Sequence, residues 1–357
     1  MRDMAGAGAE PVDRAEPRRE VSRLPKAHLH LHFTGSMRHD TLLELAERDG
    51  IVLPDPLVED WPPQLSAADE KGWFRFQRLY DVARSVLRTP DDVRRLVLEA
   101  AEDDVRDGGR WLEIQVDPSG YAARFGGITA FTDLVLDCVR DASERTGLGI
   151  AVVIAANRTR HPLDARTLAR LAAQYAGRGV VGFGLSNDER RGRTEEFEGA
   201  FRIAERAGLL LVPHGGELRG PDHVRQCLDR LGAHRLGHGV RSVEDPALLD
   251  RLVESGVALE VCPVSNVSLG VYSDLTSVPL PQLLAAGATI ALGADDPLLF
   301  GSRLAGQYAT MRAAHDLDDT VLARLAEMSF EASQAPSDVV AAAKRDIADW
   351  LASYRGI

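Results

Sequence analysis

Residues 27–33 read AHLHLHF, a short run in which histidine alternates with leucine. Side chains of a β-strand alternate between its two faces, so His28, His30 and His32 point one way and the leucines the other. Seven more β-rich runs follow, each with glycine, proline or small polar residues just after it. These runs are residues 111–116, 149–155, 180–185, 209–212, 235–238, 258–261 and 289–292.

Segments with the apolar spacing of helices lie between these runs. They include residues 131–144, 163–176, 197–207 and 243–255, the last with Ser242 as its expected N-cap. A strand, a loop and a helix repeated eight times predict an α/β fold of the TIM (β/α)8 barrel type. In such a barrel, active sites lie at the carboxyl ends of the strands.

The predicted domain organisation is one barrel domain, residues 24–357, after an N-terminal tail. Residues 1–23 are rich in Ala, Gly, Glu, Arg and Pro, and we expect them to be disordered. Residues 34–110 are too many for one loop and helix, so we expect a helical insertion at the active-site face. Its segment 72–87 is either a lid over the site, which we favour, or a docking helix without a part in binding. Residues 318–357 should supply closing helices.

The overall composition excludes several classes of protein. The chain has 42 basic and 54 acidic residues, a net charge of −12, which argues against nucleic acid as a partner. Its three cysteines include no C-x-x-C pair, so a disulfide framework is not expected. Prolines and glycines interrupt the uncharged run 275–294, which favours a loop, a short helix and a strand over a membrane span. Because no targeting segment is evident, we expect a cytoplasmic protein.

Ionisable residues gather where the runs end. They are His30, His32, His214, Glu217, His238, Asp295 and Asp296. Each motif alone has a structural explanation, such as a helix start at Asp-Asp-Pro, but their coincidence at four strand ends favours a site. Three histidines and an aspartate are the parts of a mononuclear zinc site that lowers the pKa of a water toward 7. His28 lies deepest in its strand and is interpreted as a hydrogen-bonded core residue.

With these residues in place, the sequence resembles the adenosine deaminase family of zinc-dependent barrel hydrolases. The matching segments are PKAHLHLHFTGSM, VVGFGLSNDE, HGGE, RLGHGV, LEVCPVSN and ADDPLLF, in the family's order. The resemblance implies hydrolytic deamination of a 6-aminopurine nucleoside, adenosine or deoxyadenosine, with one Zn2+ in each chain. The partner is then a small molecule, and the sequence does not determine the oligomeric state.

The resemblance also implies a role for each residue of the chemical machinery. The zinc ligands would be His30, His32, His214 and Asp295. Glu217 would transfer a proton to N1 of the purine, and His238 would orient or deprotonate the attacking water. Cys262 and Ser265 are candidates for holding the ligands in place, although a buried thiol and a turn serine are the simpler interpretation.

The implied substrate contacts include two departures from the family's pattern. Asp296 would bond N7, and His32 and Thr34 would contact the substrate as well. Asn187 replaces a glycine whose backbone N–H meets N3, and asparagine tolerates the same left-handed backbone. Thr34 replaces an aspartate that contacts the ribose 5′-hydroxyl. This second departure leaves open a 5′-modified substrate, 6-amino-6-deoxyfutalosine of menaquinone biosynthesis.

Other possible functions can be distinguished by whether the sequence contains particular residues, or by a simple assay. The carboxylate of a futalosine-type substrate would need an arginine, and the candidates are Arg38, Arg75, Arg78 and Arg160, although exposed charges are the simpler explanation. A two-metal barrel hydrolase would need a lysine at the end of the fourth run, and none is there. The H-x-E and P-C-x-x-C elements of nucleic-acid base deaminases are absent. A non-catalytic nucleoside-binding barrel would release no ammonia.

Overall fold

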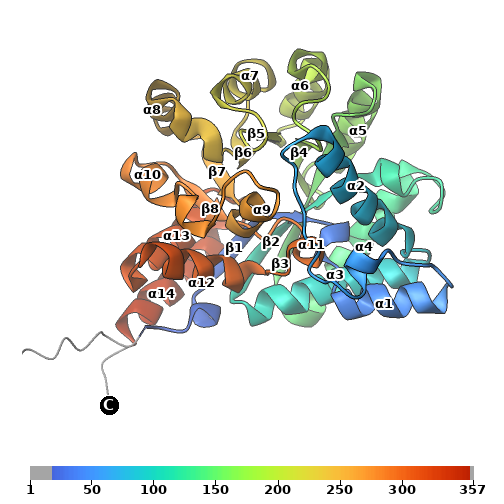
Figure 1. Ribbon diagram of the computed structural model, residues 1–357, viewed down its shortest axis with the longest axis horizontal. Coiled ribbons are helices and arrows are strands. Elements are labelled where there is room, and N and C mark those ends of the chain that lie inside the picture. Colours follow the sequence, from blue (N-terminus) through green and yellow to red (C-terminus); the bar gives the residue numbers. More distant parts are fainter. Residues whose placement is uncertain (1–17, 354–357) are drawn as a thin grey trace, which may run out of the picture.

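Eight parallel strands curl into one barrel with helices around it (Figure 1). The computed structural model describes residues 18–353. Neighbouring strands pair in chain order, and a parallel bridge between Leu31 and Asp295 joins the last strand's end to the first strand. The predicted TIM barrel is therefore confirmed. The strands are β1 (Lys26–His32), β2 (Gly109–Val116), β3 (Gly149–Asn157), β4 (Val180–Ser186), β5 (Leu210–Gly215), β6 (Arg235–His238), β7 (Ala258–Val261) and β8 (Ile290–Leu292).

Helices connect successive strands and complete the outer layer. Those between β2 and β7 are α4 (Ile128–Thr146), α5 (Pro162–Tyr175), α6 (Glu198–Arg206), α7 (Pro221–Leu231) and α8 (Pro246–Glu254). The predicted N-cap of α8 was wrong: Ser242 lies in a 3-10 turn, and the helix begins after Asp245, whose side chain accepts the Leu248 N–H. Pro246 takes the first helical position, where a missing N–H costs nothing.

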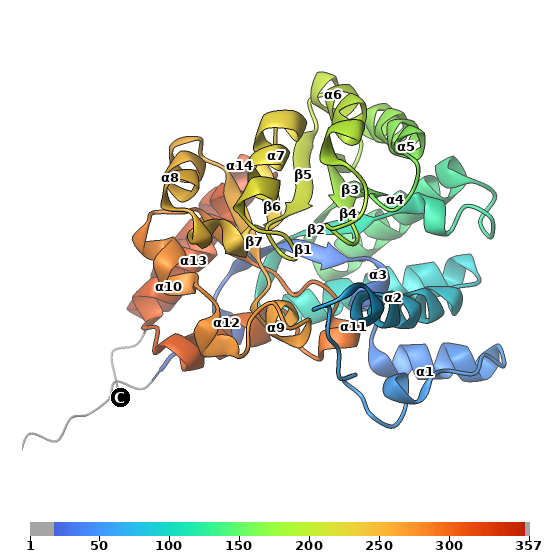
Figure 2. The ribbon, with the colours of Figure 1, turned by 45° about the horizontal axis from the view of Figure 1, so that its top comes forward.

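The segment between β1 and β2 is helical. It holds α1 (His39–Arg48), α2 (Glu70–Ser85) and α3 (Pro90–Arg106), which gather on one side of the barrel (Figure 2). Asp69 caps α2 by accepting the Gly72 N–H at 2.7 Å. The expected apolar segment 72–87 thus corresponds to α2, and Phe76 of α2 stacks on Phe300 with ring centroids 5.8 Å apart.

The remaining helices follow β7 and β8. They are α9 (Pro263–Ser268), α10 (Leu280–Ala285), α11 (Pro297–Phe300), α12 (Leu304–His315), α13 (Asp319–Glu331) and α14 (Ser337–Ala352). Residues 275–294 form a short turn, α10 and β8, as expected, and no helix among the described residues is long and apolar enough to cross a membrane. The three cysteines are buried and free.

The amino-terminal residues pack against the closing helices. Residues 1–17 of the expected tail lie outside the described residues. Residues 18–23 are ordered, contrary to the expectation for 1–23, because Arg19 pairs with Asp319 at 2.7 Å and Trp350 donates to the Glu20 carbonyl. Val21 is buried there as well.

Candidate active site

The carboxyl ends of β1, β5 and β8 bring the predicted metal-ligating side chains together. His30 and His32 come from β1, His214 from β5, and Asp295 follows β8. The Asp295 backbone pairs directly with β1: its N–H donates to the His30 carbonyl at 3.0 Å, and the His32 N–H donates to the Asp295 carbonyl at 2.9 Å. This pairing fixes the Asp295 carboxylate beside both imidazoles.

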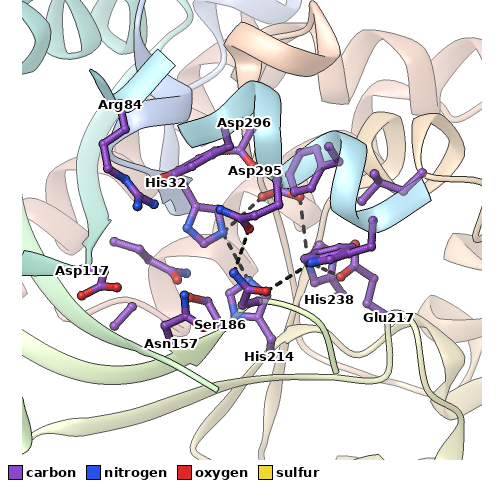
Figure 3. A pocket seen from close by; sticks show the side chains of 18 residues that line it. His32, Arg84, Asp117, Asn157, Ser186, His214, Glu217, His238, Asp295 and Asp296 are labelled. Atoms are coloured by element: carbon purple, nitrogen blue, oxygen red, sulfur yellow. Dashed lines mark hydrogen bonds and ion pairs between the residues drawn. The ribbon is translucent and has the colours of Figure 1, made fainter. Parts of the chain in front are cut away.

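Three of the four side chains, those of His32, His214 and Asp295, point toward one another in the pocket (Figure 3). His32 Nε2 lies 3.2 Å from both His214 Nε2 and Asp295 Oδ1, and His30 Nε2 lies 3.7 Å from Asp295 Oδ1. His30 Nε2 and His214 Nδ1 are buried without a hydrogen-bond partner among residues 18–353. Overlapping groups of three that could hold a metal ion together contain all four residues. Imidazole nitrogens and a carboxylate oxygen are ligands that zinc takes, so this donor set fits that ion.

The electrostatics of the group also favour a cation. Burial alone would lower the pKa of His30, but the carboxylates of Asp295 and Glu260 outweigh it and raise that pKa to about 10. Burial would raise the pKa of Asp295, but His30 and His32 hold it well below its ordinary value. Burial and the neighbouring His30 lower the pKa of His214 well below its ordinary value. The anionic Asp295 among imidazoles therefore creates a place for positive charge.

A buried series of ion pairs holds the His30 ring on the side of Nδ1. These pairs were not predicted from the sequence. His30 Nδ1 lies 2.8 Å from Glu260, whose other oxygen lies 2.8 Å from Arg235 Nε. Arg235 also pairs with Glu113 at 2.5 Å and donates to the Ala332 carbonyl at 2.9 Å. The available signal was a charged residue inside an apolar run, because such residues are buried only when paired.

Asp295 has its own support from α9. Ser265 Oγ donates to Asp295 Oδ2 at 2.5 Å, whereas the Cys262 thiol bonds the Glu260 carbonyl at 3.6 Å. Ser265 thus touches a predicted ligand, and Cys262 does not bond one. Gly237 leaves room for the two rings, because a Cβ there would lie 3.0 Å from the His30 ring and 3.1 Å from the His214 ring and would press against both.

The expected proton-transfer residues lie beside this group. His238 Nε2 is 3.6 Å from Glu217 Oε2 and 3.9 Å from Asp295 Oδ2, while Asn266 donates to His238 Nδ1 at 3.2 Å. Burial, with the Asp295 and Glu189 carboxylates, raises the pKa of Glu217 well above its ordinary value. Burial and the neighbouring His30 lower the pKa of His238 to about 4. The pKa values of these two neighbouring groups are therefore shifted in opposite directions, upward for the carboxyl and downward for the imidazole.

These side chains form one end of a pocket that we call the inner cavity. The cavity is also lined by α2 side chains and by polar residues at the carboxyl ends of β2, β3 and β4. Asp296 also lines it, and burial with the adjacent Asp295, opposed by His32, raises the pKa of Asp296 to about 7. The α2 residues are Trp73, Phe76, Gln77, Tyr80 and Arg84, and the polar ones are Gln115, Asp117, Asn157 and Ser186.

The two predicted substrate contacts that depart from the family's pattern differ in position. Asn187 lines the inner cavity and has a φ of 83°, the left-handed backbone expected for it. Thr34 does not line the cavity: it is fully buried, and its hydroxyl is hydrogen-bonded to that of Tyr121. Its direct contact with substrate is therefore not supported by its position.

The other candidates also take definite places. His28 is held by Asp104 and by the Ala294 N–H at 3.0 Å, as a core residue should be. Arg38 is committed to Asp103 and Glu102. The remaining arginine candidates divide: Arg75 and Arg160 line a second, outer pocket that shares Trp73, Gln77, Arg84, Asn157 and Asn187 with the inner cavity, and Arg78 lines neither pocket.

Comparison with known proteins agrees with this geometry. The family described as Adenosine deaminase matches residues 25–352. The chain belongs to the adenosine deaminase family. It is 62% identical to a Streptomyces virginiae protein named "Putative adenosine/adenine deaminase", over 94% of this chain and 99% of that one. An adenine deaminase of Cupriavidus necator is 35% identical over 89% of this chain and 90% of that one.

Solved structures of the family share the architecture. The adenine deaminase of Arthrobacter aurescens superposes with a TM-score of 0.85 at 29% identity, covering 92% of this chain and 99% of that one. An Arabidopsis protein solved with IMP has the same fold, with a TM-score of 0.81 at 23% identity. The superposition covers 92% of this chain and 97% of that one. This member of the adenosine deaminase family is accordingly a hydrolase that acts on carbon–nitrogen bonds.

Proposed function

We propose that this protein hydrolytically removes the 6-amino group of an adenine ring, with free adenine as its preferred substrate. The observation that carries the proposal is the convergence of His30, His32, His214 and Asp295, the last three of which line one cavity together with Glu217. Those four residues would hold one zinc ion. When bound, zinc supplies a water with a lowered pKa as the nucleophile.

The side chains around the cavity account for the rest of the chemistry. The pKa of Glu217 is raised by burial, and its Oε1 has no partner in the described part of the chain, so its protonated form can donate to N1 of the ring. His238 presents Nε2 toward Glu217 and Asp295, where it would orient the attacking water or take its proton. Protonated N1 makes C6 easier to attack, and ammonia leaves.

The remaining polar groups would orient the purine. Asp296 has a raised pKa of about 7 and a buried Oδ1 that no atom of residues 18–353 engages, so its protonated form can donate to the acceptor N7. The left-handed backbone of Asn187 would point its N–H at N3, and His32 would pack against the ring. Donors at N1, N3 and N7 together recognise a 6-aminopurine.

Free adenine is favoured over a nucleoside by the position of Thr34, outside the cavity lining. Thr34 is hydrogen-bonded to Tyr121 and is buried, so it offers nothing to a ribose 5′-hydroxyl. Two of the relatives described above are named as adenine deaminases. Adenosine is the second candidate, because the Streptomyces virginiae relative's name includes both substrates.

Ammonia release from a panel of substrates tests the proposal. The zinc-loaded protein is assayed with adenine, adenosine, deoxyadenosine, 5′-methylthioadenosine and 6-amino-6-deoxyfutalosine. We expect kcat/KM for adenine to exceed that for each nucleoside by at least about tenfold. Preference for a nucleoside would overturn the choice of substrate, and no ammonia from any 6-aminopurine would overturn the function itself.

A further inference from the structure

The loop of residues 187–190, which follows β4, is attached to the lid helix α2. Asn187 Oδ1 accepts the Trp73 indole N–H at 3.2 Å, and its Nδ2 donates to Gln77 Oε1 at 2.8 Å. Trp73 and Gln77 are four residues apart on α2, so they lie on the same face of the helix. The Asn187 side chain therefore bonds the lid twice, and only its backbone is free for substrate.

The same loop also holds the start of α2. Arg190 pairs with Asp188 at 2.8 Å and donates to the Ala67 carbonyl at 2.9 Å and to the Asp69 carbonyl at 3.4 Å. Asp69 is the N-cap of α2. Two separate points of the lid region are thus fixed by one loop.

Glu189, between these attachments, bonds the segment that carries Glu217. Its Oε1 accepts the backbone N–H of Glu217 at 3.1 Å, and its Oε2 accepts those of Leu218 and Arg219 at 3.0 and 2.8 Å. The Glu189 side chain is fully buried, and His223 Nδ1 lies 3.3 Å away. A carboxylate that accepts three consecutive backbone N–H groups determines the path of that segment.

The Glu217 carboxyl depends on this backbone placement. Its Oε1 has no hydrogen-bond partner among the described residues, and Oε2 is 3.6 Å from the nearest basic nitrogen, on His238. No strong side-chain bond therefore corrects the carboxyl if its backbone shifts. A displacement of about 1 Å is enough to cost a reaction about 100-fold in rate.

We propose that Glu189 is a positioning residue for Glu217, and that the 187–190 loop couples the closed position of α2 to the placement of the Glu217 carboxyl. The inference rests on the proposed function, because it assigns Glu217 the proton transfer. A closed lid holds Asn187 and Arg190, and the continuous short loop then holds Glu189 against residues 217–219. Opening α2 releases the loop, so the proton donor is in place only when the cavity is covered.

Hydrogen exchange tests the coupling without relying on turnover. In Asn187→Gly, which keeps a left-handed backbone and removes both bonds to α2, we expect faster amide exchange in α2 and also in residues 217–219, which Asn187 does not touch. Arg78→Ala, on α2 but away from both pockets, is the control and should exchange as the wild type does. Faster exchange confined to α2 would overturn the coupling, whatever the substrate proves to be.

Kinetics test the positioning role. Glu189→Gln replaces one acceptor oxygen by an amide that faces the same N–H donors, so we expect kcat on adenine to fall about 30-fold while KM and bound zinc stay near wild-type values. If Glu189 acts through Glu217, the substitution should cost almost nothing further in a Glu217→Gln background. An equal loss in both backgrounds, or loss of zinc, would overturn the role. If the wild type releases ammonia from adenine, the proposed function stands even when the Glu189→Gln result overturns the positioning role.

Discussion

Glu217 illustrates how burial prepares a residue for proton transfer. The side chain lies among carboxylates in a closed cavity end, and its raised pKa results from burial and from repulsion by Asp295 and Glu189. His238, 3.6 Å away, is shifted in the opposite direction by the same burial. Two neighbouring groups with separated pKa values can serve as acid and base at one pH.

Replacement of Glu217 by glutamine separates proton transfer from metal binding. Glutamine keeps the size and polarity of the side chain but has no proton to transfer, so turnover should fall by at least about 1,000-fold. The predicted ligands His30, His32, His214 and Asp295 are unchanged, so zinc measured per chain should equal that of the wild type. Wild-type turnover in this variant would contradict the acid assignment.

Side chains at strand ends could be predicted because the pattern itself places them. The alternation of β1 aims His30 and His32 the same way, and the barrel brings the ends of β5 and β8 beside them. Residues that hold a predicted ligand in place, such as Glu260 beside His30, were not predicted, because a single charged residue in an apolar run does not show which distant residue pairs with it. Thr34 was predicted to contact substrate because it aligns with a substrate-binding position of the family. Its hydroxyl instead bonds Tyr121, which is 87 residues away in the sequence and could not be foreseen as its partner.

At the scale of elements, strand positions were predictable and connections less so. All eight β-rich runs became strands, because each combines β-branched or apolar residues with a turn signal. The α8 start was misplaced since Ser242 and Asp245 are both capping residues, and only the 3-10 turn over Val240–Glu244 decides between them. A helix in the position of α2 was expected from the length of the insertion, while its attachment to the loop after β4 required the structure.

The loop after β4 should also affect stability in acid. Burial alone would raise the pKa of Glu189, but His223, Arg158 and the Arg219 N–H outweigh it and hold that pKa at about 2. Since the ordinary value is 4.5, the carboxylate stabilises the native state fully above about pH 4.5 and loses this contribution as the pH falls toward 2. The contribution is on the order of 3 kcal/mol.

Unfolding of wild type and Glu189→Gln by denaturant at two pH values measures that contribution. Glutamine does not ionise, so the difference in unfolding free energy between the two proteins should shrink from about pH 5.5 to about pH 3. A difference that stays constant over this range would contradict a lowered pKa for Glu189. Guanidinium is suitable because it allows both midpoint and slope to be compared.

At the scale of the whole molecule, closure of the barrel and assembly of the metal-ligating group depend on one residue. The backbone of Asp295 pairs with β1, and its side chain lies beside His30 and His32. Below them, Arg235 ties Glu260 and Glu113 to the carbonyl of Ala332, which follows α13. The predicted ligand group is therefore connected both to β1 and to the segment that follows α13.

Removal of zinc should lower the thermal stability of the entire domain. An ion that binds only the native state stabilises it by about 4 kcal/mol at a free concentration near 1,000 times its Kd. We expect chelator-treated protein to unfold several degrees lower than zinc-loaded protein in calorimetry. The Asp295→Ala variant should show no such difference, and Glu217→Gln should retain it; an equal midpoint with and without zinc in the wild type would contradict the predicted site.

The pairing of Asp295 with β1 has a consequence for how a newly made chain matures. The ribosome releases His30 and His32 early, but their acidic neighbour emerges only after most of the polypeptide has been translated. A nascent chain can therefore offer a metal ion no more than a partial set of ligands. Assembly of the full predicted site must wait for Asp295, so a chain that stops before this residue should bind the ion weakly or not at all.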